Sequence, residues 1–449
     1  MLLIALMMLF AHMFVDVISP LKELIQVQRG WTSDVFGTYA GSEYLLNVWG
    51  FLIVAGIILD KMGLRFTGEL SALIMFAGAC IKYYAISDAF IGSGFEAWLN
   101  SWWVAMPASA KLASLGFMIF GCGCEMAGIT ASKAMAKWFE GKEMALAMGL
   151  EMALARIGVF FIFTISPRIA GIGGADPSVV RPVAFCTALL LIGLLCYTIF
   201  CVMDKKLDSQ LGASSSGEAE EEFKISDIGK IFSSRLFWIV AMLCVLYYSA
   251  IFPFQKFAAN MLQSNLGITA TAAADIFRWF PVGAACITPF LGWYLDRKGK
   301  GATMLILGSL LMIICHTIFA LVLPAVPSKA IAFSAIILLG ISFSLVPAAL
   351  WPSIPKIMDK RYLGSAYSLI FWVQNFGLSG TPILIGYALE KSNPGVAEQI
   401  AAGVEGATYN YTVPMLLFAS LGVLALIFAL WLKADDARNH YGLEQPNIK

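Results

Sequence analysis

The chain has 449 residues, of which 59% are hydrophobic and 13% are charged, and its formal net charge is +1. A soluble protein of this size carries about twice that fraction of charged residues, so the composition excludes an ordinary soluble domain and indicates a polytopic membrane protein. A net charge near zero gives no reason to expect a nucleic-acid partner. The nine cysteines all lie in apolar runs, which favours neither a disulfide framework nor a zinc site.

The apolar runs predict an all-α polytopic membrane protein with twelve transmembrane helices, because a bilayer core needs about 20 apolar residues per helix. The run MLLIALMMLF leads into the first helix and has no small-residue cleavage site, so we interpret it as part of that helix and not as a removed signal peptide. The predicted spans are 2–26, 34–59, 66–87, 109–135, 143–168, 180–203, 234–260, 270–295, 302–324, 329–355, 362–389 and 411–433.

Lysine and arginine gather in one set of the predicted loops. These loops hold residues such as Lys133, Lys205 and Arg297, whereas the opposite loops hold only a few, such as Arg29 and Lys329. Because cytoplasmic loops carry the excess of basic residues, we expect both termini and the central linker to be cytoplasmic.

One long polar stretch, residues 204–233, interrupts the apolar sequence. Its serine, glycine and glutamate content predicts a mobile tether with a short amphipathic piece near 223–232. It divides the chain into two six-helix bundles, which cover 1–203 and 234–434, and a cytoplasmic tail follows at 435–449.

The segment 88–110, between the third and fourth spans, is longer than a turn and contains Trp98, Trp102 and Trp103. Because tryptophan collects at membrane–water interfaces, we expect an interfacial helix at the level of the headgroups. A lid over an outer vestibule is the alternative.

Two pairs of segments match across the bundles. GIILDKMGLR (56–65) and GWYLDRKGKG (292–301) each join the second and third helices of a bundle, and AMGLEMALARIG (147–158) matches AYSLIFWVQNFG (366–377) in the fifth helix. Internal repeats in a polytopic protein predict two pseudo-symmetric bundles with a site between them, as in transporters.

The G-x-x-x-D-[RK]-x-G pattern, at matching places in both bundles, resembles the major facilitator superfamily. In that family the loop aspartate packs at helix ends and stabilises the outward-open state. The resemblance therefore implies gating roles for Asp60 and Asp296, with Arg65 as a helper. The alternative, a simple basic turn at each place, requires two matching copies by chance.

Charged residues inside the predicted spans are functional candidates, because a charge at mid-bilayer costs several kcal/mol unless it is paired or hydrated. Asp16 and Glu43 lie near the outer ends of their helices and can serve as a proton site or a gate. Lys256 follows the proline break in FPFQKF and is expected to face a cavity. Asp275 and Arg278 are three residues apart on one helix and can pair with each other.

Glu125 and Arg156 lie deeper, at roughly 12 Å and roughly 21 Å from the cytoplasmic ends of neighbouring helices. Two interpretations stay open. Either the two residues form a structural salt bridge, or both face a wet cavity in which Arg156 binds a substrate carboxylate and Glu125 binds an ammonium. Gly121 and Gly123 are expected to allow close helix packing where the bundles meet.

Longer blocks resemble one branch of the superfamily, typified by the animal lysosomal dipeptide transporter. The blocks are NVWGFLIVAGIILDKMGLR, GCGCEMAG, WFEGKEMALAMGLEMALARIG, YYSAIFPF and ALWPSIPKIMDKRYLGSAYSLIFWVQNFGLS. The resemblance implies that Glu125 and Arg156 bind the two termini of a dipeptide. It also implies that Trp351 and Asn375 line the cavity, and packing alone is the other interpretation of these two residues.

Two residues depart from that branch, because Lys256 and Arg278 stand where its members have small or neutral residues. They would make the site more cationic and favour an anionic group. The lysosomal tail signal of the branch is missing, so we expect a bacterial relative in the cell (inner) membrane.

We therefore predict a secondary active or facilitative transporter that moves a small zwitterion, in particular a dipeptide, by rocking-bundle alternating access. A proton-coupled organic-anion transporter that uses Arg156, Lys256 and Arg278 is the alternative, and a non-transporting receptor fits less well. The sequence has no catalytic constellation, metal cluster or phosphate loop, so we expect neither an enzyme nor a cofactor. The expected partners are a small-molecule substrate, the lipid bilayer and, in a coupled mechanism, protons, and the chain is expected to be a monomer.

Overall fold

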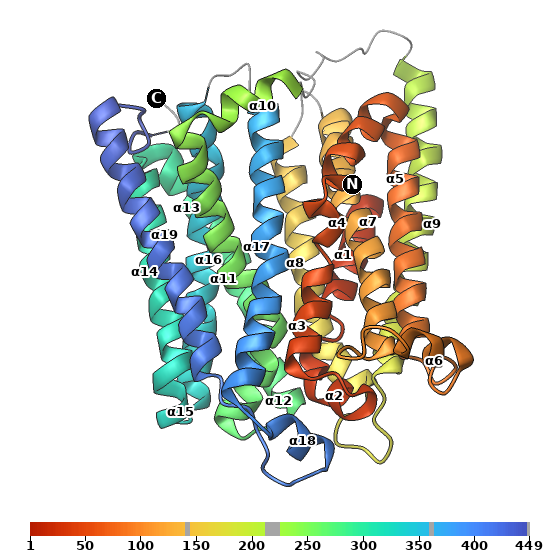
Figure 1. Ribbon diagram of the computed structural model, residues 1–449. Coiled ribbons are helices and arrows are strands. Elements are labelled where there is room, and N and C mark those ends of the chain that lie inside the picture. Colours follow the sequence, from red (N-terminus) through yellow and green to blue (C-terminus); the bar gives the residue numbers. More distant parts are fainter. Residues whose placement is uncertain (140–143, 212–224, 359–362, 447–449) are drawn as a thin grey trace.

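The computed structural model in Figure 1 describes residues 1–139, 144–211, 225–358 and 363–446. All regular elements of these residues are helices. Nine of the described helical segments are long and apolar enough to cross a membrane. The predicted all-α membrane architecture is confirmed.

The first half of the chain forms six crossings. A kink at Gly63 (φ 79°) divides the long helix α5, so that its first part completes the second crossing and the rest is the third. Breaks at Asp16 and after Ser42 divide the first two crossings into shorter helices. The elements are α1 (Leu2–Val15), η1 (Ser19–Leu21), α2 (Lys22–Arg29), α3 (Ser33–Ser42), α4 (Leu45–Val48), α5 (Phe51–Ile86), α6 (Gly94–Asn100), α7 (Ala108–Phe139), α8 (Met144–Ile169) and α9 (Val180–Leu211).

The second half repeats this pattern with six crossings. A break at Arg278 divides the eighth crossing, and the π-helical turn η3 extends the ninth. The elements are α10 (Ile225–Phe232), α11 (Arg235–Leu266), α12 (Ala270–Phe277), α13 (Phe280–Lys298), α14 (Gly301–Thr317), η3 (Ile318–Val322), α15 (Leu323–Ala325), α16 (Lys329–Ile357), α17 (Leu363–Ser392), α18 (Val396–Ala401) and α19 (Thr412–Asn439).

The segment predicted as a linker is partly helical. α9 continues into it, because Asp204 and Asp208 on its last turns pair with Arg65 of the same half. The amphipathic piece predicted near 223–232 is α10, which lies at one end of the bundle in Figure 1. Residues 212–224 lie outside the described residues.

The crossings end at two sides of the molecule (Figure 1). One side carries α10 and the C-terminal tail, and we call it the linker side. The other side carries α2, α6, α12, α15 and α18, and we call it the loop side. These two names distinguish the ends of the bundle without reference to a cell compartment.

The tryptophan-rich segment contains the short helix α6, which lies beside the bundle on the loop side (Figure 1). Trp98 of α6 and the two tryptophans that follow the helix, Trp102 and Trp103, are between 50% and 60% exposed. Leu99 on the same helix is buried against Phe90, so α6 has one attached face and one open face. This arrangement fits the interfacial helix better than a lid.

The two halves meet on the loop side, where α3 packs against α17. A Cβ on Gly37 would collide with the carbonyl oxygen of Pro382 and with Gly386, so only glycine allows this approach of two backbones. Gly41 lies equally close to the carbonyl of Ser379, and the Ser379 hydroxyl donates to the Gly41 carbonyl at 2.9 Å. The loop side is therefore closed.

Polar contacts join the halves from the loop side to mid-depth. Near the loop side, Gln26 donates to the Tyr409 hydroxyl at 2.9 Å. Deeper in the bundle, the Trp372 indole donates to the carbonyl of Val48 at 2.9 Å. On the linker side, by contrast, the ion pairs of Asp60 and Arg65 each stay within the first half.

We expected Gly121 and Gly123 to lie where the two halves meet, and this prediction is wrong. Gly121 of α7 packs against the backbone of Glu43 at the end of α3, and Gly123 packs against Met75 and Ser71 of α5. Both contacts are within the first half. The small residues of α7 therefore bring three helices of one bundle together.

Candidate functional site

A buried ionic cluster lies between the halves. Asp16 caps the C-terminal end of α1, Glu43 follows α3, and Lys256 lies on α11, three residues after Pro253. The Lys256 ammonium is 3.2 Å from Asp16 Oδ1 and 3.2 Å from Glu43 Oε2, and it donates to the carbonyl of Val15 at 2.9 Å. None of the three charged residues is more than 4% exposed. Lys256 therefore does not face an open cavity, because two carboxylates of the other half enclose its ammonium.

A second buried lysine, Lys82 of α5, lies beside this cluster. Its ammonium is 4.2 Å from the ring centre of Phe14, 4.5 Å from that of Phe117 and 5.2 Å from that of Tyr39. It has no hydrogen-bond partner among the described residues, so the aromatic faces take the place of an acceptor. The Lys256 ammonium lies 5.4 Å from the same Phe117 ring. Lys82 was not among the predicted site residues, although its position inside the third predicted span could have identified it as a buried charge.

Glu125 of α7 and Arg156 of α8 are half-buried, well inside their helices. Neither has a hydrogen-bond or ion-pair partner among the described residues, so the salt bridge that was one interpretation of the sequence is not formed. The Arg156 guanidinium lies 4.7 Å from the ring centre of Phe343, which belongs to α16 in the other half. Arg156 therefore points across the interface, and both charges lack a counter-ion from the described protein.

Aromatic side chains of the second half surround the ring that Arg156 contacts. The centre of the Phe343 ring is 6.1 Å from that of Tyr248 and 5.6 Å from that of Phe252, both on α11. The Trp351 indole donates to the Tyr248 hydroxyl at 3.2 Å, which brings this predicted residue into the same cluster. Our reading of the sequence did not single out Phe343 or Tyr248, although YYSAIFPF was among the blocks that carried the resemblance.

Asn375, the other residue predicted to line the cavity, is buried on α17. Its side-chain amide donates to the carbonyl of Phe371 at 2.9 Å, and its carbonyl oxygen has no partner among the described residues. A buried acceptor without a partner costs about 1–3 kcal/mol, so this oxygen has a reason to bind a donor from a solute. The Phe371 ring also stacks on Trp351 at 4.8 Å, which links Asn375 to the aromatic cluster.

Arg278 and Asp275 form the pair that their spacing predicts, at 3.0 Å. Arg168 of the first half binds the same carboxylate at 2.9 Å, so Asp275 also joins the halves near the loop side. The Arg278 guanidinium lies 5.4 Å from the ring centre of Phe160 on α8. Arg278 is therefore ion-paired, although it shares the single Asp275 carboxylate with Arg168.

The residues with predicted gating roles lie at the linker side. Asp60 pairs with Lys133 of α7 at 2.8 Å, and both side chains are about half exposed. Arg65 pairs with Asp204 of α9 at 3.1 Å. Asp296 lies half-buried in the last turns of α13, at the matching place in the second half. The repeated loops therefore occupy equivalent ends of the two halves.

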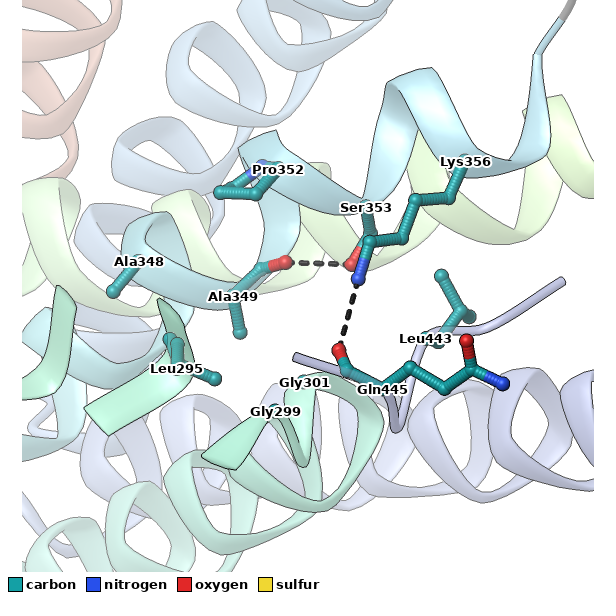
Figure 2. Close-up of a pocket in the computed structure, with 10 residues that line it drawn as sticks. All are labelled: Leu295, Gly299, Gly301, Ala348, Ala349, Pro352, Ser353, Lys356, Leu443 and Gln445. Atoms are coloured by element: carbon teal, nitrogen blue, oxygen red, sulfur yellow. Dashed lines mark hydrogen bonds between the residues drawn. The ribbon is translucent and has the colours of Figure 1, made fainter. Parts of the chain in front are cut away.

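The C-terminal tail covers the repeated loop of the second half. The backbone N–H of Lys300 donates to the carbonyl of Glu444 at 3.1 Å. Figure 2 shows Lys356 of α16 reaching the same segment, where its ammonium donates to the carbonyl of Gln445 at 3.2 Å. The turn at residues 299–301 is thus held between α16 and the tail.

These helices, repeated loops and charged interface residues define a class of protein. The chain belongs to the Major Facilitator Superfamily, whose family model matches residues 4–382 and, in a second match, residues 254–447. It is a membrane transporter and not an enzyme.

Individual relatives are similar over much of the chain. The lysosomal dipeptide transporter MFSD1 of Danio rerio is 27% identical over 376 residues, which are 82% of this chain and 75% of that protein. The lysosomal dipeptide transporter MFSD1 of Mus musculus is 29% identical over 295 residues, which are 62% of this chain and 60% of that protein.

Solved structures share the whole fold. The nucleoside transporter NupG has a TM-score of 0.70 at 14% identity and covers 96% of this chain and 98% of its own. A bacterial homologue of the human lysosomal transporter Spinster, in an inward-facing and occupied conformation, has a TM-score of 0.69 at 15% identity and covers 96% of each chain. At these identities the likeness concerns the fold alone, and it confirms the twelve-helix architecture.

Proposed function

We propose that this chain carries a small zwitterionic solute, in particular a dipeptide, across the membrane by rocking-bundle alternating access. The observation that carries the proposal is that Glu125 and Arg156, inside neighbouring crossings of the first half, have no ion-pair partner among the described residues. The relatives support the dipeptide, because each of those described above is named as a dipeptide transporter.

The two side chains suit the two ends of a peptide. A guanidinium binds a carboxylate through two parallel hydrogen bonds, and a carboxylate accepts from an ammonium; such charge-assisted bonds are about twice as strong as neutral ones. The aromatic cluster around Phe343 supplies apolar and cation-binding surface on the opposite half, where Arg156 already lies against it. A zwitterion with its charges at opposite ends would thus contact both halves, as alternating access requires.

The carboxylates beside Lys256 and Arg278 argue against the organic-anion alternative. Lys256 lies within 3.2 Å of two carboxylates, and Arg278 is paired with Asp275. Of the candidate residues that the structure describes inside the crossings, Arg156 is then the one cation, and Glu125 the one anion, that is partly exposed and has no ion-pair partner. This balance favours a zwitterion over an anion, because an unmatched charge at this depth is costly.

The direction of opening follows from the loop charges. We assign the linker side to the cytoplasm, where basic residues collect, so that the closed loop side makes this an inward-facing arrangement. Asp60, Arg65 and Asp296 then act as the cytoplasmic gate and exchange partners when that side closes. We further propose that the chain works as a monomer in the cell (inner) membrane, with both termini in the cytoplasm.

Counterflow in proteoliposomes tests this function. Liposomes preloaded with unlabelled dialanine should transiently accumulate labelled dialanine. Liposomes preloaded with a dicarboxylate or a monocarboxylate should not accumulate it. Glu125→Gln should abolish the signal. Glu69→Gln is the matched control, because Glu69 is a half-buried carboxylate of the same half that accepts from Thr198 at 2.7 Å, within the first half.

Each other outcome identifies a rival. Counterflow of dicarboxylates without counterflow of dipeptides would favour the organic-anion transporter. Binding of dipeptides without counterflow of any solute would favour a receptor. Normal dialanine counterflow in Glu125→Gln would remove the assignment of the ammonium to that residue.

A further inference from the structure

We propose that this chain binds a phosphate group on the loop side, between Arg168 of the first half and Arg278 of the second, and that a phospholipid of the surrounding membrane supplies this phosphate. The site is separate from the one proposed for the solute. The contacts between α8 and α12 carry the proposal, because they leave two guanidiniums with a single carboxylate.

The charges of this cluster do not balance. Asp275 is the one carboxylate within 4.0 Å of either guanidinium among the described residues. Its Oδ2 lies 2.9 Å from Arg168 Nη2, and its Oδ1 lies 3.0 Å from Arg278 Nη1. Two positive charges thus share one negative charge. An anion beside the two arginines would neutralise the charge that is left, which is costly to leave uncompensated in a membrane crossing.

The guanidinium of Arg278 keeps one edge without an acceptor. Its Nη1 faces Asp275 and donates to the Thr164 hydroxyl at 3.4 Å. Its Nε is buried and has no acceptor among the described residues, and its Nη2 has none there either. Nε and Nη2 form the edge with which an arginine binds two oxygens of one anion. This donor set suits an oxyanion better than a monatomic ion.

Arg168 adds donors from a second direction. Its Nη2 donates to Asp275 and its Nη1 to the carbonyl of Thr164, whereas its Nε has no acceptor among the described residues. The oxygens of a carboxylate lie in one plane, but those of a phosphate point in tetrahedral directions. Two guanidiniums from different helices therefore favour a phosphate over a carboxylate.

Aromatic rings beside the arginines favour a phospholipid as the source of the phosphate. Arg168 is the last residue but one of α8, at the loop-side end of its crossing. Four rings run across the seam next to it, with successive centres 5.9, 5.6 and 6.2 Å apart: Phe161, Phe160, Trp279 and Phe333. The first and the last of these rings are 42% and 41% exposed. Acyl chains can cover them while the phosphate binds the arginines.

A ligand at this site would favour the closed loop side. Arg168 and Thr164 belong to the first half, and Asp275 and Arg278 belong to the second. A phosphate held by both guanidiniums adds a contact between the halves, and opening of the loop side would break it. The ligand therefore binds the closed arrangement more tightly and shifts the equilibrium toward it.

Thermal unfolding in detergent tests the anion site. The delipidated chain is titrated with inorganic phosphate at constant ionic strength, which is balanced with sodium chloride. The unfolding midpoint should rise to a plateau, because a ligand of the folded chain stabilises it by mass action. Arg278→Lys should raise the half-maximal phosphate concentration about tenfold or more, since a lysine keeps the charge but lacks the edge with two donors. Arg181→Lys is the control, because Asp176 already neutralises that loop-side arginine.

Native mass spectrometry with added lipid tests the source of the phosphate. The wild-type chain should retain one molecule of phosphatidylglycerol that Arg278→Lys loses and Arg181→Lys keeps. Diacylglycerol with the same acyl chains lacks the phosphate and should not be retained. If Arg278→Lys does not fold, Arg168→Gln takes its place, because it removes one cation and leaves the pair of Arg278 and Asp275.

The outcomes separate the two sources and the rival explanations. A saturable response to inorganic phosphate without retained phosphatidylglycerol supports the anion site and overturns the lipid as its ligand. No response to either ligand, or equal responses of wild type and Arg278→Lys, overturns the proposal. Equal retention of diacylglycerol would show that the rings and not the arginines hold the lipid, which also overturns it. None of these measurements uses dialanine, so the proposed function is tested separately.

Discussion

Glu444 caps the first turn of α14 from the far end of the chain. Its carboxylate accepts from the backbone N–H of Thr303 at 2.7 Å and from the Thr303 hydroxyl at 2.8 Å. The residue that precedes the helix, Lys300, provides no side-chain acceptor for these N–H groups. The tail therefore completes a helix that begins directly after the repeated loop of the second half.

Removal of this cap should destabilise the fold. Glu444→Ala should lower the free energy of unfolding by about 0.5–2 kcal/mol, because the N–H groups of the first turn lose their acceptor. Glu444→Gln should cost less, because it keeps an acceptor and loses only the favourable charge at the helix N-terminus. Thermal unfolding in detergent measures both, with the exposed loop residue Glu405→Ala as the control. Equal unfolding midpoints for Glu444→Ala and the control would contradict the capping role.

Arg156→Lys should weaken dipeptide binding about tenfold or more. A lysine keeps the charge but cannot form two parallel hydrogen bonds to a carboxylate, and hydrogen bonds to charged groups contribute about 1.5–3 kcal/mol. A thermal-shift titration with dialanine measures the affinity, because a bound ligand stabilises the fold by mass action. Arg181→Lys, which changes a loop-side arginine paired with Asp176, is the control. Unchanged affinity would show that Arg156 does not hold the carboxylate.

Lys256→Gln should destabilise the chain by roughly 3–5 kcal/mol, because it leaves two buried carboxylates without their cation. The double variant Lys256→Gln with Glu43→Gln should recover part of that loss, since it removes one of the unpaired charges. Thermal unfolding midpoints of the two single variants and the double variant measure the coupling. Additive effects would mean that the two residues do not interact in the folded chain.

Gly37→Ala should shift the chain away from the closed loop side. The added Cβ collides with the carbonyl of Pro382, and backbone atoms cannot yield as a flexible side chain can. Val27 and Val404 are exposed residues of the two halves on the loop side, so the distance between spin labels attached there reports its opening. In Gly37→Ala this distance should lengthen, and the rate of counterflow should fall. Gly56→Ala is the control, because its Cβ would meet no atom within 4 Å. Identical label distances in the two variants would show that α3 and α17 do not need this contact.

Much of the fold follows from the spacing of residues along the chain. The length of the apolar runs predicted the crossings, and the repeated loop pattern predicted two halves of equal design. Asp275 and Arg278 could be paired from sequence because they are three residues apart on one helix, where such neighbours share a face. Interactions between residues of one helix can therefore be predicted before the fold is known.

The partners of Lys256 could not be read in this way. Asp16, Glu43 and Lys256 come from three separate crossings, and no spacing along the chain predicts that these crossings bring them together. The same reason explains why Gly121 was expected between the halves, since a glycine indicates close packing but not against which helix. Glu125 and Arg156 were found from their depth in the membrane, yet their lack of an ion pair is a property of the three-dimensional arrangement.

The two repeated loops differ in what holds them, and ionic strength should reveal the difference. In the first half, Arg65 reaches Asp208 through an ion pair whose two side chains are 43% and 41% exposed. In the second half, the backbone of the tail holds the loop together with the Glu444 carboxylate, which caps α14 and lies 3.9 Å from the Lys300 ammonium. Added salt weakens ion pairs between exposed side chains but leaves backbone hydrogen bonds intact. Added salt should therefore loosen the loop of the first half more than that of the second, so that two halves of nearly equal design respond unequally to ionic strength.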